Sequence, residues 1–402
     1  MITTNLKKIN WQFILQSGFT ILMTSYILMI AGTTQGMINS NVLILDLIIL
    51  FFLAIVWIVN PSRQVFPIKK GVTLWVSAFL LATIFSIDQG RSINQLILCS
   101  VGIFIFYFSC TLIQNGWRVS TIYQGLLISG AIFMLFGYLD FGNWYIQWLS
   151  ANPQLLIPAI QYRPVSANII ALSLNLFLMI AISEILKPDV KKTFNFILVI
   201  YIISDLFLLY MTSSRGGWLG TIAGITTFTL LLPIVYRETS RKIIEFFRIN
   251  KLYRILLISG VVFLAVGFVY ILILQSNHPT HGSIFTSRSL FWKPALQEFF
   301  TDPITGSGPF TYGSTFLKYN LASSDVVYAH SHGTPVNILT EMGIPGLATG
   351  LILLTSTIIS LWKRLKNQEP ELQTTSQLAL SAISAVCIHS IFDCFHLEPG
   401  GL

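Results

Sequence analysis

Long apolar stretches recur along the whole chain and are separated by short polar segments. A stretch of about 20 mostly apolar residues can cross the hydrocarbon core of a bilayer as an α-helix. The composition agrees, because 54% of the 402 residues are hydrophobic and only 10% are charged, unlike a soluble globular protein. We therefore predict an all-α polytopic membrane protein with about 11–12 transmembrane helices. The predicted spans are residues 13–31, 42–59, 72–87, 93–113, 121–139, 168–186, 194–211, 216–236, 254–274, 335–361 and 376–395.

The net charge of +8 is better explained by the membrane than by nucleic acid, because basic residues of membrane proteins collect in cytoplasmic loops. With the N-terminus inside, 18 of the 24 lysines and arginines fall in inner loops and 6 on the outer side. The one long polar interval, residues 275–334, then lies outside. We predict a transmembrane bundle over 1–274, this large outer loop with short amphipathic helices, and C-terminal transmembrane helices over 335–402.

A polar break interrupts the apolar sequence between the spans 194–211 and 216–236, and it carries Arg215, Gly216 and Gly217. The helix that begins there points its N-terminus outward in this topology. Free N–H groups, the helix dipole and the guanidinium would then converge as an anion site. The alternative is an arginine that snorkels to the interface, and the sequence leaves both interpretations open.

The outer loop contributes a second arginine, Arg288, followed by apolar residues at a spacing of four, such as Phe291 and Ala295. This spacing indicates a helix that lies along the membrane surface, with Pro294 in its first turn or at a kink. Alone, Arg288 is explained by a lipid headgroup contact. Together with Arg215 it is better suited to holding a diphosphate.

The pair His330 and His332 directly precedes the predicted span that begins at Pro335. Proline is favoured at the first helical position, so His332 is expected at an outward helix N-terminus, where the dipole keeps imidazole neutral. A neutral imidazole beside an anion site could deprotonate a hydroxyl. The alternative is a solvated loop histidine. Glu341, within the same span, is expected to have a partner in the loop.

The sequence implies no metal and no cofactor. The outer loops contain no Asp-x-Asp or Glu-x-Asp, and the chain has no glycine-rich phosphate loop and no Cys/His metal spacing. His389 and Asp393 lie four residues apart in the last predicted span and are interpreted as a polar pair on one helix.

Several motifs, taken in their order along the chain, resemble those of the O-antigen ligase and O-antigen polymerase family. The resemblance covers about Ile197 to Leu354, and its motifs are Thr212-Ser213-Ser214-Arg215-Gly216, Arg288 with Phe291-Trp292, Asp302-Pro303-Ile304-Thr305-Gly306-Ser307-Gly308, His330-Ser331-His332 and Glu341-Met342-Gly343-Ile344-Pro345-Gly346. The chain departs from the family at Gly333, where asparagine is usual.

The resemblance implies an inverting, metal-independent glycosyltransferase in the bacterial inner membrane, with the large loop in the periplasm. Its donor would be a glycan on undecaprenyl diphosphate, and its acceptor a hydroxyl of lipid A–core, another glycan or a protein. Arg215 and Arg288 match the arginines that engage the donor diphosphate, and His332 matches the general base. Three alternatives remain open: a polymerase of the same family, a bicarbonate-type anion transporter, and a lipid-binding scaffold without catalysis.

Overall fold

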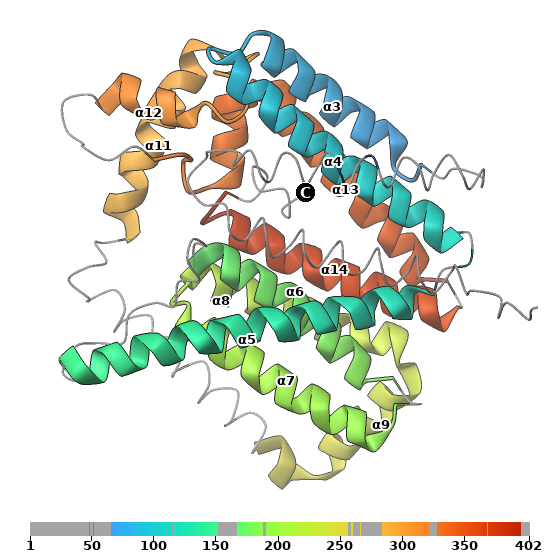
Figure 1. The fold of residues 1–402 in the computed structure, drawn as a ribbon. Helices are drawn as coiled ribbons and strands as arrows, with labels where there is room; N and C mark the ends of the chain where they lie inside the picture. The colour runs from blue at the N-terminus through green and yellow to red at the C-terminus, as the bar shows by residue number, and fades with distance from the viewer. Residues whose placement is uncertain are drawn as a thin grey trace, which may run out of the picture. The chain divides into compact units, whose positions relative to one another are not determined.

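The structure is a computed structural model that describes residues 66–114, 116, 118–151, 167–187, 190–255, 284–320, 328–367 and 369–394, with isolated positions 48, 51, 259 and 266. Within these residues every regular element is an α-helix, which confirms the predicted all-α class (Figure 1). The helices are α3 (Lys69–Ile84), α4 (Gln89–Gln114), α5 (Val119–Ala151), α6 (Ala167–Ile185), α7 (Lys192–Met211), α8 (Arg215–Val235), α9 (Arg237–Ile249), α11 (Ile284–Thr301), α12 (Tyr312–Asn320), α13 (Thr334–Leu365) and α14 (Pro370–Ser390).

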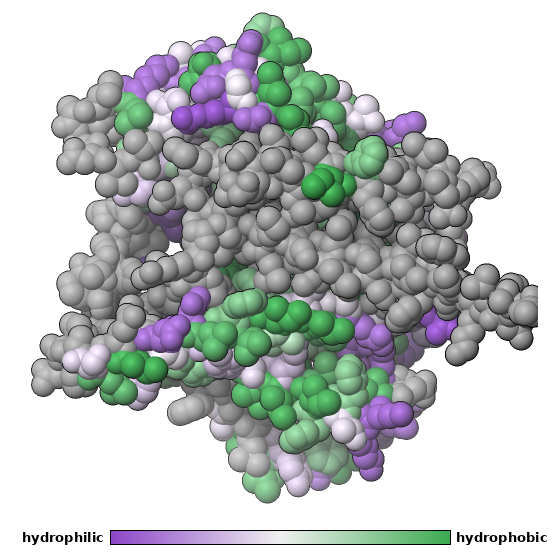
Figure 2. Space-filling view, viewed as in Figure 1, coloured by the Kyte–Doolittle hydropathy of each residue, from purple (hydrophilic) through white to green (hydrophobic). Residues whose placement is uncertain are grey.

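Among the described residues, six helices are long and apolar enough to cross a membrane, namely α4 to α8 and α13. On α7, large apolar side chains at a spacing of three or four are exposed: Phe196, Ile200, Ile203, Phe207 and Tyr210. Figure 2 shows hydrophobic residues in green gathered over α5 and α7. A helix that presents such a stripe outward while burying Asp205 is suited to a lipid environment. The chain is an all-α polytopic membrane protein.

The predicted spans agree with the helices to different degrees. The spans at 13–31, 42–59 and 254–274 lie outside the described residues apart from a few positions. Helix α3 has 16 residues, fewer than the about 20 that a span needs, and the crossing predicted for α14 stays a prediction. The predicted span 121–139 ends too early, because α5 continues to Ala151 through a segment without a proline.

The break at residues 212–214 separates α7 from α8, as predicted. Ser213 has a φ of 54°, so the chain turns sharply there, and Arg215 is the first residue of α8. Pro294 lies inside α11 rather than in its first turn, because that helix already begins at Ile284.

The described helices fall into two compact units. One unit includes Asn94–Ser214, where α5, α6 and α7 pack against one another. The other includes Lys70–Ile93 and Arg215–Cys394, where α8 packs along α14 and α11 packs against α12 and α13. Every predicted site residue belongs to this second unit, so the loop helices α11 and α12 form one body with the apolar helices α8 and α13.

Inside the second unit, backbone hydrogen bonds fasten the loop segment Pro303–Gly308 to a kink in α13. The N–H groups of Ser307 and Gly308 donate to the carbonyls of Thr340 and Glu341 at 3.0 and 2.9 Å, and Ile344 N–H donates to the carbonyl of Pro303 at 2.9 Å. The kink is at Gly343, whose φ of 62° and ψ of −162° are not helical. Backbone hydrogen bonds thus join the two glycine-rich motifs, residues 302–308 and 341–346. We call this contact the clasp.

Substituting Gly343 by alanine is expected to lower the thermal stability of the protein. Its φ and ψ lie in a region that is essentially restricted to glycine, where strain costs about 1–3 kcal/mol. An added Cβ would also come within 2.5 Å of the carbonyl oxygen of Ile304. The midpoint of thermal unfolding in detergent, followed by tryptophan fluorescence, measures the loss.

Gly142→Ala is the matched control for this substitution. Gly142 lies in α5, and an added Cβ there meets nothing within 4 Å. Alanine in a helix is about 0.5–1 kcal/mol more stable than glycine, so this variant should unfold at the wild-type temperature or slightly above. Equal unfolding temperatures for the two variants would contradict the clasp.

Candidate active site at the start of helix α13

The histidine pair lies directly before α13, as predicted. Gly333 is the N-cap residue of that helix, and Pro335 lies in its first turn. The preceding turn is held by Asn337, whose Oδ1 accepts the N–H of Ser331 at 2.9 Å. His332 has a φ of 52°, a conformation that is uncommon outside glycine and that clusters at functional sites. The turn therefore fixes the position of the His332 ring.

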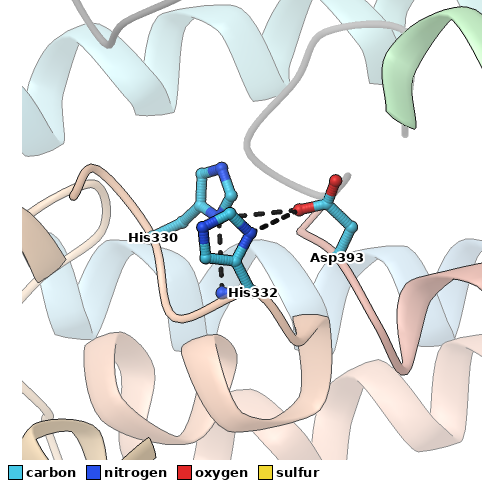
Figure 3. Close-up of side chains that lie close together, drawn as sticks. All are labelled: His330, His332 and Asp393. Atoms are coloured by element: carbon cyan, nitrogen blue, oxygen red, sulfur yellow. Dashed lines mark hydrogen bonds and ion pairs between the residues drawn. The ribbon is translucent and has the colours of Figure 1, made fainter. Parts of the chain in front are cut away.

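Both histidine rings lie beside Asp393, as Figure 3 shows. Asp393 Oδ1 is 3.4 Å from Nδ1 of His332 and 3.7 Å from Nδ1 of His330. The two ring centroids are 4.3 Å apart, and the backbone N–H of His332 donates to Nδ1 of His330 at 3.3 Å. Asp393 is buried, with 4% of its surface exposed. The Asp393 carboxylate is thus a third polar group beside His330 and His332.

Asp393 reaches the histidines because the chain folds back after α14. The carbonyl oxygen of Asp393 accepts hydrogen bonds from the N–H and the hydroxyl of Thr334 at 3.0 and 2.9 Å. Its Oδ1 accepts the N–H of Cys394 at 2.9 Å, which orients the carboxylate. The sequence interpretation placed Asp393 on one helix with His389, but α14 ends at Ser390. Sequence reasoning therefore missed this residue as a member of the site.

An aromatic wall supports the His332 ring. Its centroid lies 4.6 Å from that of Phe291 and 6.2 Å from that of Tyr328. Phe291 belongs to a buried cluster with Ala295, Tyr312 and Phe316, and the hydroxyl of Tyr312 donates to its carbonyl oxygen at 2.7 Å. The apolar face that the sequence predicts after Arg288 is thus the face of α11 that packs against α12 and the histidine turn. Leu296 and Phe300, also on α11, are exposed.

Arg288 and Trp292, four residues apart on α11, each carry a buried side-chain N–H that can donate a hydrogen bond. Nε of Arg288 and Nε1 of Trp292 are both buried and lack a hydrogen-bond partner within the described residues. Trp292 Nε1 lies 3.3 Å from where a Cβ on Gly333 would be, which places it next to His332. A buried donor without an acceptor costs about 1–3 kcal/mol. A ligand rich in hydrogen-bond acceptors would satisfy both donors.

The charge of Arg215 also acts on Arg288. Burial lowers the pKa of Arg288, the Asp393 carboxylate opposes this effect, and the positive charge of Arg215 adds to it. Arg288 thus experiences the charge of the site's carboxylate and that of the second predicted arginine. The structure thus brings together both predicted histidines and one carboxylate, and the charge of Arg288 acts on this group.

His330 is held in its neutral form. Burial lowers its pKa to about 4, and the positive charge of Arg288 acts in the same direction against the opposing effect of Asp393. A neutral ring with Nδ1 accepting a backbone N–H carries its proton on Nε2. His330 thus contributes no charge at neutral pH and shapes the turn that carries His332.

The remaining predicted residues have clear structural surroundings. Glu341 has the loop partner that was expected, because its Oε1 accepts the N–H of Tyr312 at 3.0 Å. An added Cβ on Gly216 would lie 2.6 Å from the ring of His389, so this glycine lets α8 approach α14. Gly217 is buried in the same turn. The diphosphate role of these two glycines stays a prediction.

One group of side chains in the described part of the chain has donor atoms close enough for a metal ion. It comprises His330, His332 and Asp393, whose candidate ligand atoms all lie within 4.8 Å of one another. The sequence, which separates Asp393 from the histidines, did not predict this grouping.

Residues 197–351 match a family model described as O-antigen ligase. The chain carries an O-antigen ligase domain. This domain includes both arginines, both histidines and Glu341, while Asp393 lies beyond the matched residues. No curated protein matches the chain. The match supports the family resemblance and an enzyme of the O-antigen ligase and polymerase type, a family that implies a lipid-linked glycan donor and an acceptor in the membrane.

Proposed function

We propose that this protein transfers a glycan from undecaprenyl diphosphate to an acceptor hydroxyl at the periplasmic face of the bacterial inner membrane, with inversion and without a metal in the transfer step. The observation that carries the proposal is His332, backed by Asp393 at 3.4 Å and in ring contact with Phe291, about one turn along α11 from Arg288, whose buried Nε has no partner within the described residues. His332 would supply a base, and Arg288 would supply a positive charge.

The His332 ring is suited to the role of general base. Asp393 lies 3.4 Å from its Nδ1, so a proton on Nδ1 faces the carboxylate and the lone pair is left on Nε2. Asp393 then acts as a positioning residue that selects this tautomer. An acceptor hydroxyl at Nε2 would lose its proton to that nitrogen as its oxygen attacks the anomeric carbon.

The arginines are suited to the leaving group. As the acceptor oxygen forms its bond to the anomeric carbon, the bond from that carbon to the diphosphate oxygen breaks, and its electron pair leaves with the diphosphate. Arg288 and Arg215 would stabilise the charge that develops on this oxygen, as bidentate donors do for phosphate groups. A single displacement from the opposite face inverts the anomeric configuration.

The acceptor separates the ligase from the polymerase within this chemistry. Transfer to lipid A–core or to a protein makes the enzyme a ligase, and transfer to another glycan chain makes it a polymerase. Purified protein incubated with undecaprenyl-diphosphate glycan and each acceptor in turn distinguishes the two by its product. An absence of transfer to every acceptor, with the donor bound, would instead support the lipid-binding scaffold.

We expect the large loop to face the periplasm, because most cations fall on the opposite side of the predicted topology. Asp302, which follows α11, and Arg248, in α9, are both exposed. A cysteine at position 302 should react in intact cells with a thiol reagent that cannot cross the inner membrane, and one at position 248 should not.

The wild-type protein, with its four native cysteines, gives the background for this labelling. Permeabilised cells should label both new cysteines. Reaction of the two positions from the same side of the membrane in intact cells would overturn the topology.

A further inference from the structure

Three electron-pair donors converge between the histidine turn and the segment after α14. Ligand atoms that bind one Zn²⁺ tetrahedrally at about 2.0–2.1 Å lie about 3.3–3.4 Å apart. The distance from Asp393 Oδ1 to Nδ1 of His332 is 3.4 Å, and that to Nδ1 of His330 is 3.7 Å. These separations are longer than a hydrogen bond of 2.7–3.2 Å and approach the edge of a metal tetrahedron.

We propose that His330, His332 and Asp393 form a binding site for one borderline transition-metal ion of the Zn²⁺ type. Two imidazole nitrogens and one carboxylate oxygen are the donor set of open zinc sites, in which a fourth position remains for water or another ligand. Imidazole suits zinc, nickel and cobalt, whereas Mg²⁺ and Ca²⁺ require mostly oxygen ligands. The site therefore discriminates against the hard divalent cations.

The surroundings support these three ligands as a preorganised set. The N–H of Cys394 holds Asp393 Oδ1 at 2.9 Å, as second-shell donors do for ligating carboxylates. The aromatic contact with Phe291 holds the His332 ring. Metal binding must displace the 3.3 Å hydrogen bond from the His332 N–H to Nδ1 of His330, which is already long, and the proton between Nδ1 of His332 and Asp393.

The two arginines set the conditions under which the metal binds. The charge of Arg288 acts on the histidine–Asp393 group, so it opposes a bare dication. An anion held by the arginines removes this repulsion. We therefore expect tighter Zn²⁺ binding in the presence of inorganic sulfate, an anion that itself binds Zn²⁺ only weakly, than in its absence.

A metal on Nδ1 of His332 would also oppose the proposed transfer, and this part of the inference rests on the proposed function. With Nδ1 bound to the metal, the ring proton moves from Nδ1 to Nε2, and Nε2 then has no lone pair for the acceptor hydroxyl. Zn²⁺ is thus an inhibitor, and a chelator should restore transfer.

The test is equilibrium binding of Zn²⁺ to the purified full-length protein, carried on a tag without histidine, followed by metal analysis. The wild type should bind one Zn²⁺ per chain, and 1 mM Mg²⁺, on the order of a typical cellular concentration, should not displace it. His330→Ala and Asp393→Asn should each weaken binding at least about tenfold. The double variant His278→Ala/His281→Ala, which leaves the three ligands in place, should bind as the wild type does.

Unchanged affinity in His330→Ala and Asp393→Asn would overturn the site. Because either variant could lose its fold, X-ray absorption of the wild-type zinc complex provides a second measurement. The spectrum should show two imidazole ligands. A sulfur ligand, which Cys394 could supply, or the absence of imidazole ligands would refute the assignment.

The inhibition experiment separates this inference from the proposed function. If Zn²⁺ binds to the two imidazoles and glycan transfer is unaffected, the metal site is supported and His332 is refuted as the base. Transfer inhibited by Zn²⁺ with equal potency in the wild type and in Asp393→Asn would place the inhibitory ion elsewhere and overturn the link between this site and transfer.

Discussion

Replacing His332 by alanine is expected to reduce glycan transfer by about 100- to 10,000-fold, the usual cost of removing a positioned base. The binding of lipid-linked diphosphate should persist, because Arg215 and Arg288 remain. His330→Ala should cost less, since its ring accepts the N–H of His332 and supports the turn without taking the proton. Transfer rates with purified donor and acceptor, together with donor affinity, measure both effects.

Two results would contradict this assignment. An active His332→Ala protein would exclude the residue as the base, and a His330→Ala protein as inactive as His332→Ala would exclude the division of roles between them. Thermal unfolding of both variants serves as the control, because each removes one imidazole from the same turn.

Asp393→Asn tests the positioning role that the structure adds. The amide keeps the size of the side chain but loses the charge that favours a proton on Nδ1 of His332. We expect a lower kcat with a donor KM close to that of the wild type, and partial recovery in Asp393→Glu. A change in KM alone would assign Asp393 to donor binding instead.

The second large effect is expected at Arg288. Its buried Nε has no partner within the described residues, so a diphosphate oxygen would complete it. Arg288→Lys keeps the positive charge but loses this donor and the bidentate fork. A hydrogen bond to a charged group contributes about 1.5–3 kcal/mol, so donor affinity should fall by about 10- to 150-fold. Arg215→Lys is expected to act in the same direction.

Arg91→Lys is the matched control. Arg91 lies in the same unit and on the same predicted side of the membrane, but its side chain is 52% exposed and pairs with Asp88 at 3.3 Å. Its substitution should leave donor affinity unchanged. Wild-type affinity in both Arg215→Lys and Arg288→Lys would rule out the diphosphate role.

The sequence by itself determined the elements and the membrane character of this chain. Apolar runs predicted the long helices, because a bilayer requires a backbone whose hydrogen bonds are satisfied internally. The break before Arg215 and the proline after His332 marked two helix starts, since both depend on local backbone preferences. A carboxylate within an apolar run, Glu341, required a partner for the same solvation reason.

Only the tertiary structure decided which groups meet at the site. Asp393 joins His332 through backbone hydrogen bonds between the segment after α14 and Thr334, and Tyr312 meets Glu341 through a turn fastened to a kinked helix. Gly216 is explained by the ring of His389 on another helix. These contacts join residues far apart in the chain, so no local period or propensity encodes them. They follow from how apolar helices pack and from where each buried polar group finds its partner.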